Sequence, residues 1–180
     1  MPVVSQRARS LGTENAFVVL AEVNQLIRSG RDVISFCIGQ PDFPTPDNIQ
    51  NAAVAAIRGG KHGYTPSAGI NELREAVARD ILRTRGLTVD PADVVVAAGA
   101  KPFIGYTVLS VTDYGAGDEV IYPNPGFPIY ESQILANGAV PVPIHLRESR
   151  GFTFDPQELA DKITPRTKLL ILNSPQNPTG

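Results

Sequence analysis

The sequence predicts an α/β protein with a doubly wound, mostly parallel sheet, and three observations support that fold class. First, strand and helix patterns alternate from Asp93 onward, as in βαβ units with right-handed crossovers. Second, residues 94–96 are three consecutive valines, a run typical of a parallel strand that is buried on both faces. Third, the short apolar run Lys168–Leu172 ends in a turn rich in asparagine and proline.

Three helices and one strand are expected ahead of this alternation. Apolar residues recur at helical spacing from Thr13 to Ser29, and a short strand is predicted over Val33–Ile38. A second helix is expected over Asp47–Ile57, with its first residue as the cap. The third follows the loop 63–70 and ends before Gly86, with acidic residues in its first turns and arginines in its last, as the helix dipole favours.

The second half of the chain is expected to contain four strands and three helices. In chain order we predict a strand over Asp93–Ala98, a helix over Pro102–Val111, a strand over Asp118–Tyr122, a helix over Tyr130–Ala136, a strand over Val140–Ile144, a polar hairpin near Glu148–Gly151, a helix over Asp155–Lys162 and a strand over Lys168–Leu172.

The composition is that of an ordinary globular protein. The chain has 180 residues, a formal net charge of −2, 42% hydrophobic and 19% charged residues, so no charge excess favours nucleic acid or an anionic membrane. No apolar run is long enough to span a bilayer, and residues 1–20 contain no signal-peptide core. The single cysteine, Cys37, cannot form an internal disulfide, which agrees with a cytoplasmic location. No residue is assigned to a metal.

The turn after the last predicted strand reads Asn-Ser-Pro-Gln-Asn-Pro-Thr-Gly over residues 173–180. In open α/β sheets, ligands bind beyond the carboxyl ends of the strands, which is where this turn lies. The amides of Asn173 and Asn177 can each donate and accept, and two prolines, Pro175 and Pro178, fix the backbone that orients them. The turn alone is equally compatible with a plain strand-to-loop junction.

A second turn of interest is Gly99-Ala100-Lys101, between a predicted strand and a predicted helix that Pro102 can begin. A small-residue turn followed by a helix amino terminus is a general anion site. The chain has neither a Gly-x-Gly-x-x-Gly fingerprint nor a Walker sequence, so the turn is not a dinucleotide or P-loop motif.

The turn 173–180 resembles the Asn-Pro-x-Gly signature of class I/II pyridoxal-phosphate-dependent aminotransferases, the aspartate aminotransferase family of fold type I. Three other stretches resemble that family in the expected order: the loop 39–43, the string Tyr64–Ala78 and the turn 99–101. The resemblance covers essentially this whole chain, but only the amino-terminal part of the family. It implies that residues 1–45 belong to the small domain and entry loop, and residues 46–180 to the first part of the cofactor-binding large domain.

The resemblance implies a role in cofactor binding for several residues. Gly99, Ala100 and Lys101 would hold the phosphate of pyridoxal 5'-phosphate, and Phe127 would stack on its ring where the family often has tryptophan. Asn177 would donate a hydrogen bond to the phenolic oxygen of the cofactor. Asn177 and Phe127 would also contact the substrate. Lys101 has two other interpretations, a contact with a distal carboxylate of the substrate or a solvated surface lysine.

Two further roles follow from the resemblance. Gly39 would contact the substrate carboxylate, because a glycine lets the backbone approach closely. Tyr64 would reach across the interface of a homodimer to the cofactor phosphate of the partner. Tyr130 is assigned to packing alone.

The chemistry of the family also needs a Schiff-base lysine, and the four lysines here do not suit that role. In the family that lysine follows Asn-Pro-x-Gly, so we expect no catalytic residue among these 180 and a fragment that is inactive by itself. The predicted function of the complete protein is transfer of an amino group between an amino acid and a 2-oxo acid. The alternatives are a lyase or decarboxylase of the same fold, or a non-catalytic sensor domain, which would need a DNA-binding module ahead of Met1.

Overall fold

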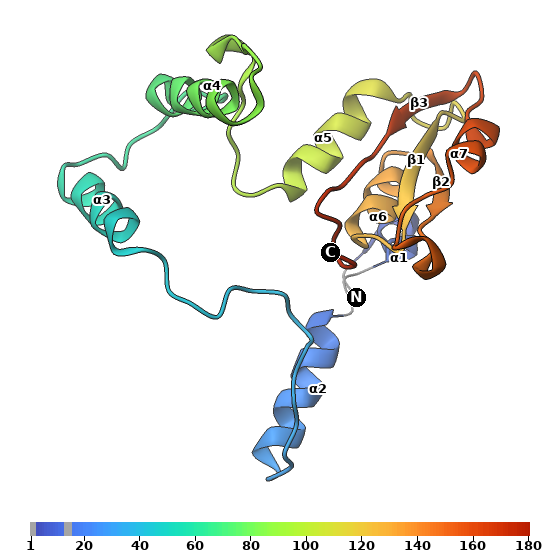
Figure 1. Cartoon of the computed structure of the whole chain (residues 1–180), viewed down its shortest axis with the longest axis horizontal. Coiled ribbons are helices and arrows are strands. Elements are labelled where there is room, and N and C mark those ends of the chain that lie inside the picture. Colours follow the sequence, from blue (N-terminus) through green and yellow to red (C-terminus); the bar gives the residue numbers. More distant parts are fainter. Residues whose placement is uncertain (1–2, 13–15) are drawn as a thin grey trace. The chain divides into compact units, whose positions relative to one another are not determined.

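The computed structural model describes residues 3–12 and 16–180, and the chain divides into two compact units (Figure 1). The first, called the sheet unit here, comprises Met1–Val18 and Gly99–Gly180. The second, called the helical unit, comprises Val19–Ala98. Helix α2 (Ala16–Arg28) contains the boundary between them.

The sheet unit is built on strands β1 (Glu119–Asn124), β2 (Val140–His145) and β3 (Thr167–Leu170). Their order is β2-β1-β3 and both pairings are parallel. The chain therefore passes from β1 to one neighbour and returns across β1 to the other, which is the reversal that defines a doubly wound sheet. The predicted fold class is confirmed in this part of the chain.

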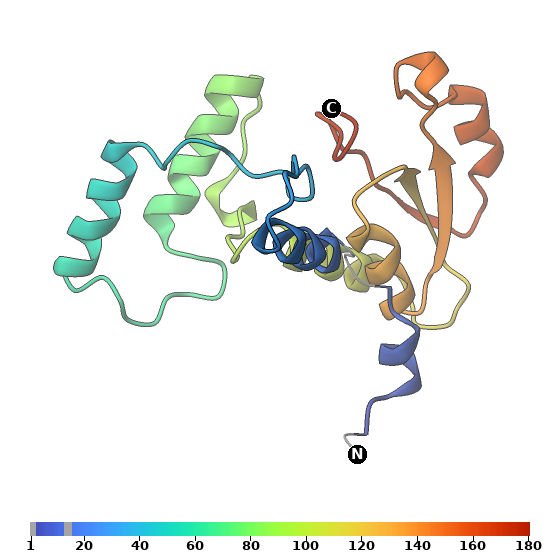
Figure 2. The same ribbon diagram turned by 90° about the horizontal axis from the view of Figure 1, so that it is seen from below.

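The two crossover helices lie on opposite sides of this sheet. Helix α6 (Ile129–Ala136) connects β1 to β2, and α7 (Pro156–Lys162) connects β2 to β3 (Figure 1, Figure 2). Right-handed crossovers that run in opposite directions place their helices on opposite faces. Helix α5 (Lys101–Val111) packs beside α6.

The core of the sheet unit surrounds the central strand. Val120 and Ile121 of β1 are fully buried, as expected for a strand with a neighbour on each edge and a helix layer on each face. Apolar side chains from α5, β1, α6 and the turn between α6 and β2 pack into one cluster; its members are Val108, Val120, Tyr122, Tyr130, Ile134 and Ala139. The strands and helices that were predicted from Pro102 onward are confirmed, with ends that differ by at most two residues.

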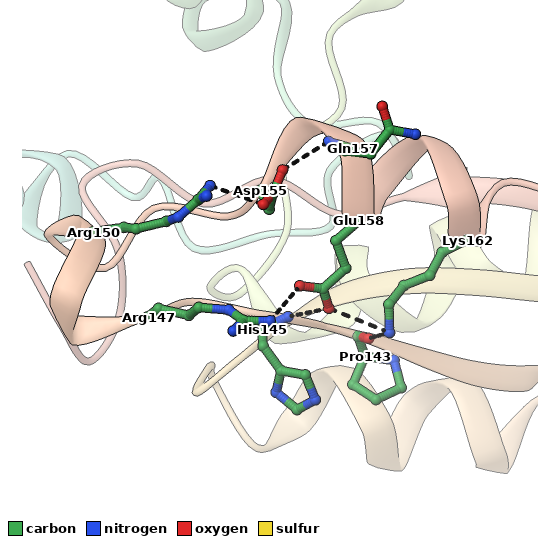
Figure 3. Close-up of polar contacts among 8 residues, drawn as sticks. All are labelled: Pro143, His145, Arg147, Arg150, Asp155, Gln157, Glu158 and Lys162. Carbon is green, nitrogen blue, oxygen red and sulfur yellow. Dashed lines mark hydrogen bonds and ion pairs between the residues drawn. The ribbon is translucent and has the colours of Figure 1, made fainter.

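Polar contacts join α7 to β2 (Figure 3). The carboxylate of Glu158 accepts from the backbone N–H of His145 at 3.4 Å and from Nη2 of Arg147 at 3.3 Å. Nζ of Lys162 lies 3.5 Å from the same carboxylate and donates to the carbonyl oxygen of Pro143 at 2.6 Å. β2 carries two prolines, Pro141 and Pro143, which have no N–H to donate, and prolines on an edge strand hinder pairing with further strands. β2 therefore ends the sheet on this side among the described residues.

The helical unit contains α3 (Asp47–Arg58) and α4 (Asn71–Arg85), which confirms both predicted helices. Helix α4 ends at Gly86, whose φ of 67° is the left-handed conformation that a glycine adopts without strain. A short 3₁₀ turn, η1 (Pro91–Asp93), follows. Two short elements of the sheet unit, α1 (Gln6–Ser10) and η2 (Glu148–Arg150), complete the set.

Both strands predicted in or near the helical unit are wrong. Val33–Ile38 has no strand structure, and its Ile34 and Phe36 are 81% and 92% exposed. In Asp93–Ala98 only Val94 is buried, Val95 is 54% exposed, and Val96 donates a hydrogen bond to the carbonyl of Ala68 at 3.0 Å. A β-branched run becomes a strand only beside another strand, and the described residues place none beside either segment.

The predicted starts of the helices at Asp47 and Thr13 have different outcomes. Asp47 does not cap α3; Pro46 precedes the helix and Asp47 is its first residue, where a carboxylate still interacts favourably with the helix dipole. The predicted start at Thr13 lies outside the described residues, and α2 is described from Ala16.

Candidate cofactor site

Three segments of the sheet unit meet beyond the carboxyl ends of its strands: the amino end of α5, the turn after β1 and the turn after β3. Nζ of Lys101 lies 5.5 Å from the ring centroid of Phe127, which connects α5 with the β1 turn. Nε2 of Gln176 donates to the carbonyl of Pro125 at 2.9 Å, which connects the β3 turn with the β1 turn. The sheet thus brings together the segments in which Lys101, Phe127 and Asn177 were predicted as site residues.

The amino end of α5 has the features of an anion site. Gly99 has a φ of 87°, and within the described structure a side chain at this position would meet no atom within 4 Å. Ala100 precedes the helix, and no side chain among the described residues caps it. Pro102 has no N–H, and the N–H of Phe103 donates to the carbonyl of Ala100 at 3.1 Å. The helix dipole and the N–H groups of the turn ahead of Pro102 are therefore the features that favour an anion such as a phosphate.

The turn after β1 presents Phe127 in a fixed place. A Cβ on Gly126 would lie 2.1 Å from the carbonyl oxygen of Pro123, so only glycine fits there. Phe127 is half-buried against the core cluster, and its ring meets the ring of Tyr130 edge to face, with centroids 5.9 Å apart and planes at 89°. The segment therefore offers a constrained aromatic side chain beside the amino end of α5.

The turn after β3 is held by its own amides. Oδ1 of Asn173 accepts from the backbone N–H of Asn177 at 2.8 Å, and Nδ2 of Asn173 donates to the carbonyl of Pro175 at 3.1 Å. The N–H of Gly180 donates to the carbonyl of Gln176 at 2.7 Å. Asn173 thus shapes the turn, whereas the side chain of Asn177 is exposed and available to a ligand.

Gln176 is the residue here that sequence reasoning missed. Its Nε2 bonds the neighbouring turn, while its Oε1 is buried with no hydrogen-bond partner among the described residues. No local pattern could have indicated this contact, because Pro125 lies 51 positions away in the sequence.

A cleft of about 350 Å³ opens at the same edge of the sheet. It is lined mainly by apolar residues from the ends of the three strands and from the loop after η2; these include Pro123, Ile144, Leu146, Phe152, Phe154 and Leu172. It shares Asn173, Gln176 and Gly180 with the β3 turn, but Phe127 and Lys101 do not line it. The cleft therefore adjoins the predicted cofactor residues without containing them.

Gly39 and Tyr64 belong to the helical unit. A Cβ on Gly39 would meet nothing within 4 Å in the described structure, and the side chain of Tyr64 is fully exposed. Their predicted roles, toward substrate and toward a partner subunit, stay predictions.

The two tyrosines in the core beneath this edge remain protonated at neutral pH. Burial raises the pKa of Tyr122 to about 12, with a further contribution from Glu131, and burial also raises the pKa of Tyr130. Neither phenol supplies a base. In the part of the chain that is described, no three His, Cys, Asp or Glu side chains cluster as metal ligands, and no helix is long and apolar enough to cross a membrane.

Solved structures define the class of protein to which this arrangement belongs. Aspartate aminotransferase from Thermus thermophilus with maleate matches with a TM-score of 0.92 and 37% identity, over 99% of this chain and 46% of that one. Alanine aminotransferase from Pyrococcus furiosus matches with a TM-score of 0.91 and 31% identity, over 98% of this chain and 45% of that one. The chain thus has the fold of the amino-terminal part of these aminotransferases.

Sequence comparison assigns the family. The family model described as "Aminotransferase class I and II" matches residues 31–180. The chain belongs to this pyridoxal-phosphate-dependent family. Among relatives, the probable aspartate/prephenate aminotransferase of Aquifex aeolicus is 40% identical over 177 residues, and the aspartate aminotransferase of Geobacillus stearothermophilus is also 40% identical over 177 residues. Each match covers 98% of this chain and 44% of the relative, so the chain spans less than half the length of these proteins.

Proposed function

We propose that the full-length protein is a pyridoxal-phosphate-dependent aminotransferase that moves an amino group between an amino acid and a 2-oxo acid. The observation that carries this proposal is the meeting of three segments at the carboxyl edge of the sheet, one suited to a phosphate, one to a flat ring and one to a polar ring substituent. The names of the relatives, aspartate and aspartate/prephenate aminotransferases, support the same class of reaction.

The residues at this edge fit the chemistry of pyridoxal 5'-phosphate. The open turn at Gly99 and the uncapped amino end of α5 would hold the phosphate, because N–H groups and the helix dipole favour an anion there. Phe127 would cover one face of the ring, since stacking gives contact area without a polar demand. The exposed amide of Asn177 would donate to the phenolic oxygen.

The bound cofactor supplies an electron sink for charge at the substrate Cα, and the protein supplies orientation and electrostatics. Among the residues of this chain, Lys101 adds a positive charge beside Phe127, where it can face the cofactor phosphate or an acidic substrate group. Gly39 would leave room for the substrate carboxylate, since no described atom crowds it. These groups bind and orient, and we assign no proton transfer to them.

We also propose that the full-length protein is a cytoplasmic homodimer, in which Tyr64 contacts the cofactor phosphate held by the partner. The exposure of the whole Tyr64 side chain supports a contact with another molecule. A Tyr64→Phe variant that keeps its affinity for pyridoxal phosphate would contradict that contact.

The experiment that tests the proposed activity begins with the intact mass and the visible spectrum of the purified protein with pyridoxal phosphate, before and after borohydride. We expect a mass above the 19.2 kDa of this chain and a visible band that borohydride removes. Incubation with an amino acid alone should then yield at most one equivalent of product per active site, and continued turnover should require a 2-oxo acid. Release of ammonia or carbon dioxide without a 2-oxo acid would instead indicate a lyase or a decarboxylase.

A further inference from the structure

We propose that Tyr130 is a positioning residue, which sets the plane of the Phe127 ring so that one face of that ring is held ready for the cofactor. The inference rests on the proposed function, because it assumes that Phe127 stacks on pyridoxal phosphate. It extends that function by giving a core tyrosine a part in cofactor binding.

The two rings form one local unit. The backbone N–H of Tyr130 donates to the carbonyl of Phe127 at 3.0 Å, which closes a turn at the amino end of α6. Within this turn the rings lie 5.9 Å apart, centroid to centroid, with their planes at 89°. This is the edge-to-face geometry that aromatic pairs prefer, because the positive edge of one ring faces the negative face of the other.

Tyr130 is the fixed member of the pair. It is 7% exposed and lies within the core cluster with Val108 and Ile134, whereas Phe127 only packs against that cluster from its margin. Rotation of a phenylalanine ring about its last torsion is otherwise weakly restricted. A perpendicular neighbour that cannot move therefore determines the plane in which the Phe127 ring lies.

The position of Lys101 shows that the Phe127 ring lies beside the proposed phosphate site. Its Nζ lies 5.5 Å from the centroid of Phe127, so the ring stands at the amino end of α5, where the phosphate is proposed to bind. A ring in this place and plane can stack on a pyridine ring attached to that phosphate. A ring that rotated freely would first have to be ordered, and that ordering would weaken binding.

The test uses the full-length protein and two readouts, the dissociation constant for pyridoxal phosphate and the circular dichroism of the visible cofactor band. Tyr130→Leu removes the perpendicular ring, and we expect the dissociation constant to rise about threefold to tenfold, with a weaker dichroic band. Tyr130→Phe keeps the ring and should keep both values within about twofold. Ile134→Val, a change in the same cluster one helical turn away, should lower the melting temperature and leave both values unchanged.

If Tyr130→Leu does not fold, Tyr130→Met replaces it, because an unbranched side chain fills the same space without offering a ring. Wild-type affinity and dichroism in a folded Leu or Met variant would overturn the inference. A Tyr130→Phe variant that behaves like Tyr130→Leu would also overturn it, because the hydroxyl would then be the group that matters. A wild-type protein with no visible band would remove the proposed function, and this inference with it.

Discussion

Gln176 and Pro125 join the turn after β3 to the turn after β1, through a 2.9 Å hydrogen bond from Nε2 to the carbonyl oxygen. Each turn carries one residue that we assign to the cofactor, Asn177 in the first and Phe127 in the second. The separation of these two residues therefore depends on a contact that neither of them makes. Because both strands are short and end at the same edge, a single side-chain bond can hold the two turns together.

Gln176→Glu should weaken cofactor binding without unfolding the protein. The change replaces a donor with a carboxylate that faces the carbonyl of Pro125, which loses a hydrogen bond and adds repulsion worth about 1–3 kcal/mol. Spectral titration should show that the affinity for pyridoxal phosphate falls by about tenfold or more. Gln157→Glu is the matched control, since Gln157 donates to Asp161 on the exposed side of α7. Equal affinities in the two variants would contradict the role of Gln176.

Gly39→Ala should separate substrate binding from folding. No described atom lies within 4 Å of a Cβ at this position, and φ is outside the left-handed range, so the free energy of unfolding should change by less than about 0.5 kcal/mol. If the substrate carboxylate approaches this backbone, the added methyl group should raise KM for the amino acid in the full-length protein. Steady-state kinetics and thermal melting measure the two effects. An unchanged KM would remove Gly39 from the substrate site.

Gly126→Ala should lower the free energy of unfolding, which Gly39→Ala is expected to leave nearly unchanged. The new Cβ would lie 2.1 Å from the carbonyl oxygen of Pro123, and backbone cannot yield as a flexible side chain can. The turn must shift, and we expect a loss of about 1–3 kcal/mol in the free energy of unfolding. Denaturant titration of Gly126→Ala and Gly39→Ala compares their free energies of unfolding. A Gly126→Ala protein as stable as Gly39→Ala would show that this turn is not constrained as described.

Sequence reasoning succeeded where the cause of a structure is local. The helices from Asn71 to Arg85 and from Lys101 to Val111 were predicted within one or two residues, because spacing, caps and prolines all lie within the element. It failed where a segment becomes a strand only by pairing with a neighbouring strand. The valines at 94–96 carry a stronger strand signal than β1, yet β1 forms a strand because β2 and β3 pair with it, and no described strand lies beside the valines.

The candidate site shows the same division. Phe127, Asn177 and the turn at Gly99 were predicted from short motifs and the resemblance that these motifs support. The contacts that hold them in place, from Tyr130 and Gln176, depend on packing and on a residue far away in the sequence. Single residues at strand ends can be assigned from a sequence, whereas the residues that position them require coordinates.

Asn177→Ala should change the cofactor and leave the fold intact. The side chain is exposed, and Asn173, which remains, holds the backbone N–H of residue 177. Loss of the amide removes a donor to the phenolic oxygen, so the visible absorption of bound pyridoxal phosphate should shift and its affinity should fall about tenfold. Absorption spectra across pH and a melting curve report the two properties. An unaltered spectrum and rate would exclude Asn177 from the cofactor site.

Glu119→Gln should make stability less dependent on pH in the acid range. Glu119 lies at the start of β1, where its carboxylate accepts from the hydroxyl of Thr164 at 2.6 Å and from Nε and Nη2 of Arg166 at 3.0 and 2.7 Å. These two partners, the threonine hydroxyl first, lower the pKa of Glu119 below its ordinary 4.5 although burial acts in the other direction.

The direction in which stability changes with pH follows from the lowered pKa of Glu119 in the folded state. Below about pH 4.5 the unfolded chain binds a proton at this carboxyl that the folded protein does not yet bind, so acid favours unfolding. The stabilisation by Glu119 is complete above that pH and is lost as pH falls through the lower folded-state pKa. Glu119→Gln should therefore melt earlier than wild type at neutral pH, and the difference should narrow in acid.

Melting curves between about pH 3 and pH 7 measure this difference. Glu75→Gln is the control, because Glu75 pairs with Arg79 at 3.7 Å on an exposed helix surface, where ion pairs contribute little. A constant gap between wild type and Glu119→Gln across the whole pH range would mean that Glu119 stabilises the protein by packing rather than as a carboxylate.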